Sequence, residues 1–190
     1  MASGYWQDLT TDDFARLDAA GTLAVLPVAA IEQHGPHLPL VTDALINEAI
    51  VAATLRRLPP RPTVLVLPAM TIGASLEHTA FAGTLDIDAG TLLASWKAVG
   101  ASVARAGIRK LVIFNSHGGQ AALVDQAALQ LRVELGMFVV RASYFSFGAP
   151  PGLFEAAELA HGLHGGEVET SLMLHLRPDL VREEALRDFT

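Results

Sequence analysis

The chain repeats one pattern, in which a short apolar run is followed by a polar turn and then by a segment with helical spacing. The apolar runs cover residues 23–31, 63–67, 110–114 and 137–145. Such runs are typical of strands that are covered on both faces. Helices between them favour right-handed crossovers between parallel strands. The sequence therefore predicts an α/β fold, a three-layer sandwich with a mainly parallel sheet and helices on both of its faces.

The helical segments are predicted from apolar spacing and from the residues that end each one. They are expected at residues 7–19, at 44–58, from 92 to a stop at 107, at 120–135 and from about 167 to 176. Residues 146–163 are predicted to be a looser segment, because they contain two prolines and several glycines. Since no repeat or linker interrupts the 190 residues, we expect a single domain over 1–190.

Composition excludes several classes of function. The net charge of −7 argues against a nucleic-acid-binding surface, and the absence of cysteine excludes disulfides and thiolate metal sites. The apolar runs are too short to span a bilayer, so no membrane partner is expected. The first residues lack the pattern of a signal peptide, and a cytoplasmic location is consistent with these features.

The stretch EQHGPHLPLVTD, residues 32–43, carries the densest chemistry. Glu32 and His34 are two residues apart, so on extended backbone their side chains share a face. Asp43 ends the stretch and could join them or simply cap the next helix. Two carboxylates and an imidazole suit Zn, Mn or Fe. A solvated histidine and a helix cap are the ordinary alternatives for this stretch.

Two further strands end in polar turns. NSHGGQ, residues 115–120, places His117 after one strand, and Glu77 and His78 follow another. Because parallel strands end at the same edge of a sheet, we expect these side chains to lie near Glu32 and His34. A plain surface loop is the ordinary alternative for the Glu77 segment.

The three stretches EQHGPHLPLVTD, NSHGGQ and HGGEVETS, supported by GASLEH and FAGT, together resemble the creatininase family of metal-dependent amidohydrolases. The resemblance implies a creatininase-like fold, two divalent metal ions (Zn, Mn or Fe) and a homo-oligomer, often a hexamer. By motif position, Glu32 and His117 would bind one metal and His34 the other, with Asp43 bridging both. Family chains usually run some tens of residues longer, so we expect a C-terminal tail of the family to be missing here.

The last metal ligand depends on where the chain departs from creatinine-hydrolysing members. Those members supply a glutamate at the position of Gly119, whereas other members supply it from the third motif. The resemblance therefore implies that Glu167 is the fifth ligand and that Glu169 is a supporting residue or a helix cap. His164 matches the histidine that is thought to shuttle protons in the family.

The implied function is hydrolysis of a C–N amide bond other than an ordinary peptide bond, by a metal-bridging hydroxide. His164 would protonate the leaving nitrogen, and His37, Glu77 and His78 would line or support the pocket. The substrate would be a small-molecule amide, such as a cyclic amide, a formamide or a peptide-like compound. Creatinine is disfavoured because Trp6 and Trp96 both lie far from the third motif.

Two other functions stay open. A dinuclear phosphoesterase would need a cationic clamp near the metals, but the three motifs contain no Arg or Lys. A non-catalytic binding or assembly protein with the same fold would have a broken ligand set.

Overall fold

The sheet has five parallel strands in the order β1-β3-β2-β4-β5. We describe the protein from a computed structural model that covers residues 2–162 and 164–187. The four predicted apolar runs all form strands, which are β2 (Thr22–Val28), β3 (Thr63–Val66), β4 (Lys110–Asn115) and β5 (Phe138–Ser143). The two-residue edge strand β1 (Gly4–Tyr5) was not predicted. The α/β prediction is therefore confirmed.

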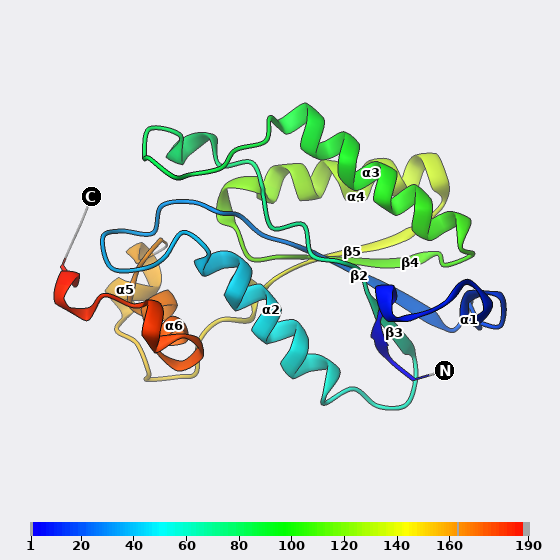
Figure 1. Ribbon diagram of the computed structural model, residues 1–190, viewed down its shortest axis with the longest axis horizontal. Helices are drawn as coiled ribbons and strands as arrows, with labels where there is room; N and C mark the ends of the chain where they lie inside the picture. Colours follow the sequence, from blue (N-terminus) through cyan, green and yellow to red (C-terminus); the bar gives the residue numbers. More distant parts are fainter. Residues whose placement is uncertain (1, 163, 188–190) are drawn as a thin grey trace.

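Helices cover both faces of the sheet, which makes three layers (Figure 1). One face carries α3 (Ala89–Arg105) and α4 (Ala121–Leu135), which pack against each other. The other face carries α2 (Thr42–Leu55) and α6 (Glu167–Leu176), with α5 (Ala156–His161) beside α6. The short helix α1 (Thr11–Ala15) lies near the end of the sheet where β2 begins.

The main core lies between the sheet and the pair α3–α4. It includes Leu26 from β2, Trp96 from α3 and Leu131 from α4, each exposed by 1% or less. A Cβ on Gly100 would lie 2.5 Å from a methyl group of Leu131, so the glycine lets the two helices approach closely. Leu38, Ile46 and Met173 form a smaller core that joins the 32–43 loop to α2 and α6.

Two helices differ from the prediction. The segment predicted as one helix over 7–19 is helical only in α1, where Thr10 and Asp13 form a capping box. Asp18 then accepts a hydrogen bond from the Gly21 N–H at 3.0 Å, which makes a turn of the residues after the helix. Helix α5 lies within the segment predicted to be loose, since a short alanine-rich stretch separates its Pro and Gly residues.

Helix α2 is fixed to the carboxyl ends of β2 and β4. The Asn47 amide donates to the carbonyl oxygens of Val28 and Phe114, at 3.1 and 3.2 Å, and to the Ser116 hydroxyl. The buried amide therefore holds the first turns of α2 over the strand ends, where the polar loops begin. In the described part of the chain, no helix is long and apolar enough to cross a membrane.

Candidate metal centre and active site

The loop after β2 carries Glu32 and His34 into the protein. Its ends are held together by the Glu32 N–H, which donates to the Leu40 carbonyl at 3.0 Å. Gly35 has a φ of 71°, a left-handed conformation that favours glycine. Glu32 and His34 are each only 1% exposed. This loop therefore delivers a carboxylate and an imidazole to a buried position.

Asp43 lies between two imidazoles. Its Oδ1 is 3.3 Å from His34 Nε2, and its Oδ2 is 3.4 Å from His117 Nδ1. Val41 occupies the cap position of α2, so Asp43 is not the helix cap and its carboxylate is directed to the site. One carboxylate oxygen thus faces each histidine, which is the arrangement that a carboxylate bridging two metal ions requires.

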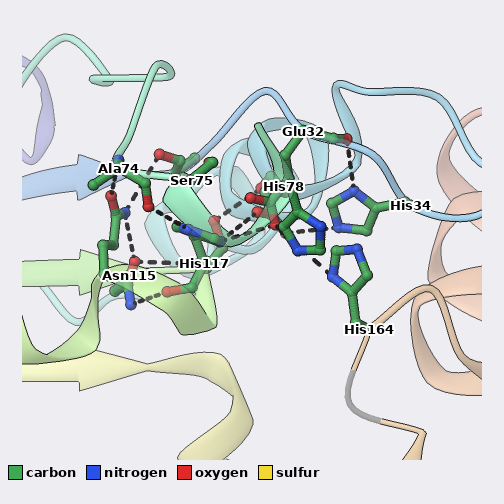
Figure 2. A network of polar contacts seen from close by, with 12 residues as sticks. Glu32, His34, Ala74, Ser75, His78, Asn115, His117 and His164 are labelled. Carbon is green, nitrogen blue, oxygen red and sulfur yellow. Dashed lines mark hydrogen bonds and ion pairs between the residues drawn. The ribbon is translucent and has the colours of Figure 1, made fainter. Parts of the chain in front are cut away.

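His117 is held on both sides (Figure 2). Its Nδ1 is 3.0 Å from Glu32 Oε1, while its Nε2 donates to the Ala74 carbonyl at 2.8 Å. The Asn115 side chain donates to the His117 carbonyl at 2.6 Å and accepts from the His117 N–H at 3.1 Å. Gln120 donates to Asn115 at 2.8 Å. These contacts fix where the imidazole points.

Backbone carbonyls also fix which ring nitrogen faces the cluster. His34 Nδ1 lies 3.0 Å from the Glu32 carbonyl, and His164 Nε2 lies 2.5 Å from the Gln33 carbonyl. Since a carbonyl only accepts, these nitrogens and His117 Nε2 carry the protons. His34 Nε2, His117 Nδ1 and His164 Nδ1 are therefore the nitrogens offered to the carboxylates. Metal-binding histidines are commonly oriented in this way.

The structure brings Glu169, and not Glu167, to this cluster. Glu169 is 3% exposed, and its Oε2 is 3.8 Å from His34 Nε2. The Gly165 N–H donates to that oxygen at 2.6 Å, and Tyr144 donates to Oε1 at 3.1 Å. Glu167 is exposed on α6, because a helix turns by about 100° per residue and positions two apart face different sides.

The three candidate pocket residues have different positions. Glu77 and His78 line a cavity beside the cluster, and His78 Nε2 is 3.8 Å from Glu32 Oε1. The His78 and His164 rings stack with centroids 4.2 Å apart. His37 is not among the residues that line this cavity. It is buried, and its Nε2 lies 2.8 Å from the Thr170 hydroxyl, which ties the 32–43 loop to α6.

The cavity has a volume of about 220 Å³. It is lined by carboxylates, imidazoles, two glycines and one phenylalanine, namely Glu32, Asp43, Glu77, His78, His117, Gly118, Gly119, Phe145, His164 and Glu169. Neither Lys nor Arg is among these described lining residues. Three groups of side chains offer ligand atoms within 4.8 Å of one another: Glu32–His34–His164, Glu32–Glu77–His117 and His34–Asp43–Glu169.

Burial and ion pairing oppose each other at the two central imidazoles. Burial lowers the pKa of His34, but Asp43 and Glu169 outweigh it and raise that pKa to about 9. Burial likewise acts against the charged form of His117, and Asp43 and Glu32 raise its pKa to about 10. The carboxylates thus hold two positive charges in place, as they would hold cations.

Two groups beside the central imidazoles have pKa values shifted toward their neutral forms. Burial raises the pKa of Glu169, whose carboxylate also lies near that of Asp43. Burial and the positive charge on His34 lower the pKa of His164 to about 4. In the metal-free protein these two effects favour the neutral imidazole of His164, whose Nδ1 faces Glu32.

Comparisons with known proteins show which family the chain resembles. The family described as creatininase, creatinine amidohydrolase, matches residues 7–190. The "Mycofactocin precursor peptide peptidase" of Mycobacterium ulcerans is 33% identical over 94% of this chain and 68% of its own length. The "Creatinine amidohydrolase" of Pseudomonas putida is 33% identical over 92% of this chain and 72% of its own length. The chain spans about two thirds of the length of such curated relatives, between 66% and 72%.

Solved structures agree with the sequence comparisons. A structure described as "Creatininase Mn" has a TM-score of 0.81 at 31% identity over 99% of this chain and 78% of the other chain. A creatininase variant of the Zn-Zn type has the same TM-score and identity over 100% of this chain and 78% of the other. Because the family match covers nearly the whole sequence and these structures share its fold, the chain belongs to the creatininase family.

Proposed function

We propose that the protein is a metal-dependent amidohydrolase that cleaves a C–N amide bond in a small or peptide-like substrate. Two divalent metal ions would be held by Glu32 and His117 on one side and by His34 and Glu169 on the other, with Asp43 between them. This set keeps four of the five ligands expected from the sequence and replaces Glu167 with Glu169.

The observation that carries the proposal is the position of Asp43. Its two oxygens face two different imidazoles, and each imidazole has a second carboxylate nearby, Glu32 at 3.0 Å from His117 and Glu169 at 3.8 Å from His34. A single metal needs one such group of side chains. Two groups that share a carboxylate support a pair of metals.

The side chains fit metal ions in a further respect. Oε2 of Glu32 is buried and has no hydrogen-bond partner among the described residues, and Oδ2 of Asp43 has only the 3.4 Å ion-pair contact with His117 Nδ1. An unpaired buried carboxylate oxygen is costly, and a bound cation would satisfy it. Imidazole nitrogen and carboxylate oxygen are the ligands that Zn and Mn take in hydrolases. Two metals in such a site would activate water and polarise the amide carbonyl.

The chain's own residues would then move the proton. His164 donates its Nε2–H to Gln33 and keeps the Nδ1 lone pair toward the cluster, 3.8 Å from Glu32 Oε1. Its Nδ1 can take up the proton that the attacking water gives up and pass it to the leaving nitrogen, which would otherwise depart as an unstable anion. Its side chain is 28% exposed, so a bound substrate can reach it.

The walls of the cavity guide the choice of substrate. The absence of Lys and Arg from its described lining counts against a phosphate ester, whose transition state needs cationic support. Trp96 is buried in the main core and Trp6 packs against Phe14, so neither supports binding of creatinine here. A cyclic amide, a formamide or a peptide-like amide remains the proposed substrate class.

Assembly as a homo-oligomer remains a further proposal. It is supported by the apolar surface of the edge strand β5, where Phe138 is 59% exposed and Val140 is 38% exposed.

The proposal is tested by loading the metal-free protein with zinc or manganese and screening amides. The panel contains creatinine, N-formyl amines and short peptides, and a phosphate monoester serves as the comparison substrate. Metal-dependent hydrolysis of an amide, abolished by Asp43→Ala, is the expected result. Hydrolysis of the phosphate ester alone would overturn it, and so would the absence of amide hydrolysis by protein that holds both metals.

A further inference from the structure

Glu77 differs from the other carboxylates that line the cavity. The side chains of Glu32, Asp43 and Glu169 are exposed by 4% or less, and each lies against an imidazole of the cluster. The side chain of Glu77 is 43% exposed. It is therefore the carboxylate of this cavity that a ligand entering from solvent meets first.

The carboxylate of Glu77 does not form a good hydrogen bond with His117, its neighbour in the cavity. Its Oε1 lies 3.5 Å from His117 Nε2, too far for a good hydrogen bond. The proton on that nitrogen is already donated to the Ala74 carbonyl at 2.8 Å. Glu77 consequently keeps lone pairs for a hydrogen-bond donor in the cavity.

The chain makes room for this carboxylate at Gly119. A Cβ on Gly119 would lie 1.6 Å from Glu77 Oε1 and 2.8 Å from His117 Nε2, whereas a Cβ on Gly118 would meet nothing within 4 Å. Neither glycine has a positive φ, so backbone conformation does not require glycine at position 119. The missing side chain at 119 is therefore needed for the space that Glu77 occupies.

The surrounding wall selects the kind of donor. Phe145, which is 41% exposed, also lines the cavity, and an aromatic face attracts a cation. The described lining contains neither Lys nor Arg, and the basic atom nearest to Glu77 Oε1 in an ion-pair contact is His117 Nε2 at 3.5 Å, whose proton is directed to the Ala74 carbonyl. An open carboxylate and an aromatic ring together complement a cationic nitrogen group.

We propose that Glu77 is a specificity-determining residue that binds a cationic nitrogen group of the substrate, an amine or a guanidinium, beside the amide that is cleaved. Gly119 is small because a side chain there would displace this carboxylate. The inference rests on the proposed amidohydrolase function and adds the charge of the substrate to it.

The test compares a small amide that carries a charged amine with the same amide after the amine is acetylated, and Glu77→Gln separates the effect of the charge from that of the acetyl group. Glycinamide carries a protonated amine and N-acetylglycinamide does not, and their dissociation constants on the zinc-loaded protein are measured by NMR titration. We expect the wild type to prefer glycinamide by about tenfold, the lower end for a hydrogen bond to a charged group, because Glu77 is partly exposed. Glu77→Gln should lose this preference and keep both zinc ions.

Two further variants sharpen the test. Glu48→Gln changes an exposed carboxylate of α2 that does not line this cavity, and it should leave the preference unchanged. Gly119→Ala should abolish the preference, because the added Cβ displaces the Glu77 carboxylate. Circular dichroism melting curves verify that each variant is folded.

Several results would overturn the inference. One is equal binding of the two amides by the wild type, and another is a preference that survives in Glu77→Gln. Loss of a zinc ion in Glu77→Gln would show instead that Glu77 is a metal ligand. Binding is read from chemical-shift changes and not from product, so a wild type that prefers glycinamide but hydrolyses no amide would refute the proposed function and leave the Glu77 assignment intact.

Discussion

Replacing Glu169 by glutamine should weaken metal binding, whereas the same change at Glu167 should not. Both residues lie in the first turn of α6 and both changes remove one negative charge. The Glu169 carboxylate is buried 3.8 Å from His34 Nε2, whereas Glu167 is exposed. Glu169→Gln should therefore weaken one metal site, and Glu167→Gln should leave both sites intact.

The expected change in Tm follows from the linkage between metal binding and folding. A domain of 190 residues has an unfolding entropy of about 0.4 kcal/mol/K, and one site filled at about 100 times its Kd adds about 2.7 kcal/mol to stability. Each filled site should thus raise Tm by about 7 °C. Loss of a ligand should weaken its site by more than the roughly 10- to 100-fold that loss of a supporting hydrogen bond costs.

The assay is differential scanning calorimetry of metal-free protein with and without zinc, together with elemental analysis. The wild type and Glu167→Gln should show the full rise in Tm and bind about two ions per chain. Glu169→Gln should show about half of that rise and bind about one ion. If Glu167→Gln loses an ion while Glu169→Gln keeps two, the assignment of Glu169 is refuted.

Three further predictions concern protons and packing. In metal-free protein, burial opposes the charged forms of His34 and His117, but their carboxylate partners raise the pKa values to about 9 and 10, above the usual 6.5. Their stabilising effect is therefore complete below pH 6.5 and is lost as pH rises through 9 and 10, so Tm should fall over that range; a flat profile would contradict these shifts. His164→Ala should keep both metals and lose roughly 10²- to 10⁴-fold in kcat, and full turnover would exclude its proton transfer. Asn47→Ala should destabilise the fold by about 2 kcal/mol in denaturant titrations, because it removes the buried hydrogen bonds of the amide to the Val28 and Phe114 carbonyls; an unchanged midpoint would disprove this.

Much of the sheet could be predicted because its signal is local. The run at 110–114 is predicted to be a strand and forms most of β4, since a strand buried on two faces needs consecutive apolar residues. β1 carries no such signal, because two residues at an edge need no buried face. Helix α1 is shorter than the predicted helix over 7–19, because the residues after Ala15 form a turn in which Asp18 accepts a hydrogen bond from Gly21.

Four members of the cluster could be placed together from the sequence. Glu32, His34 and His117 follow two strands that prove to be neighbours, and Asp43 begins the helix that covers them. The parallel sheet brings these ends to one edge, so chain order alone predicts their proximity.

The choice between Glu167 and Glu169 could not be made by counting along a motif. It depends on which side of α6 faces the site, and that side carries Met173, four residues after Glu169. The apolar spacing of α6 therefore indicates which side of the helix faces the site. The contacts of Tyr144 and Gly165 with Glu169 could not be predicted from the sequence, because they depend on the conformation of the segment between β5 and α6.

The most direct test of the account is an anomalous diffraction map from crystals of the zinc-loaded protein. We expect two peaks, one beside His34 Nε2 and the other beside His117 Nδ1, on either side of Asp43 and about 3.5–4 Å apart. Such a result would establish the bridging carboxylate on which the proposed chemistry depends. A single peak, or no peak at Asp43 in protein incubated with excess zinc, would contradict the account.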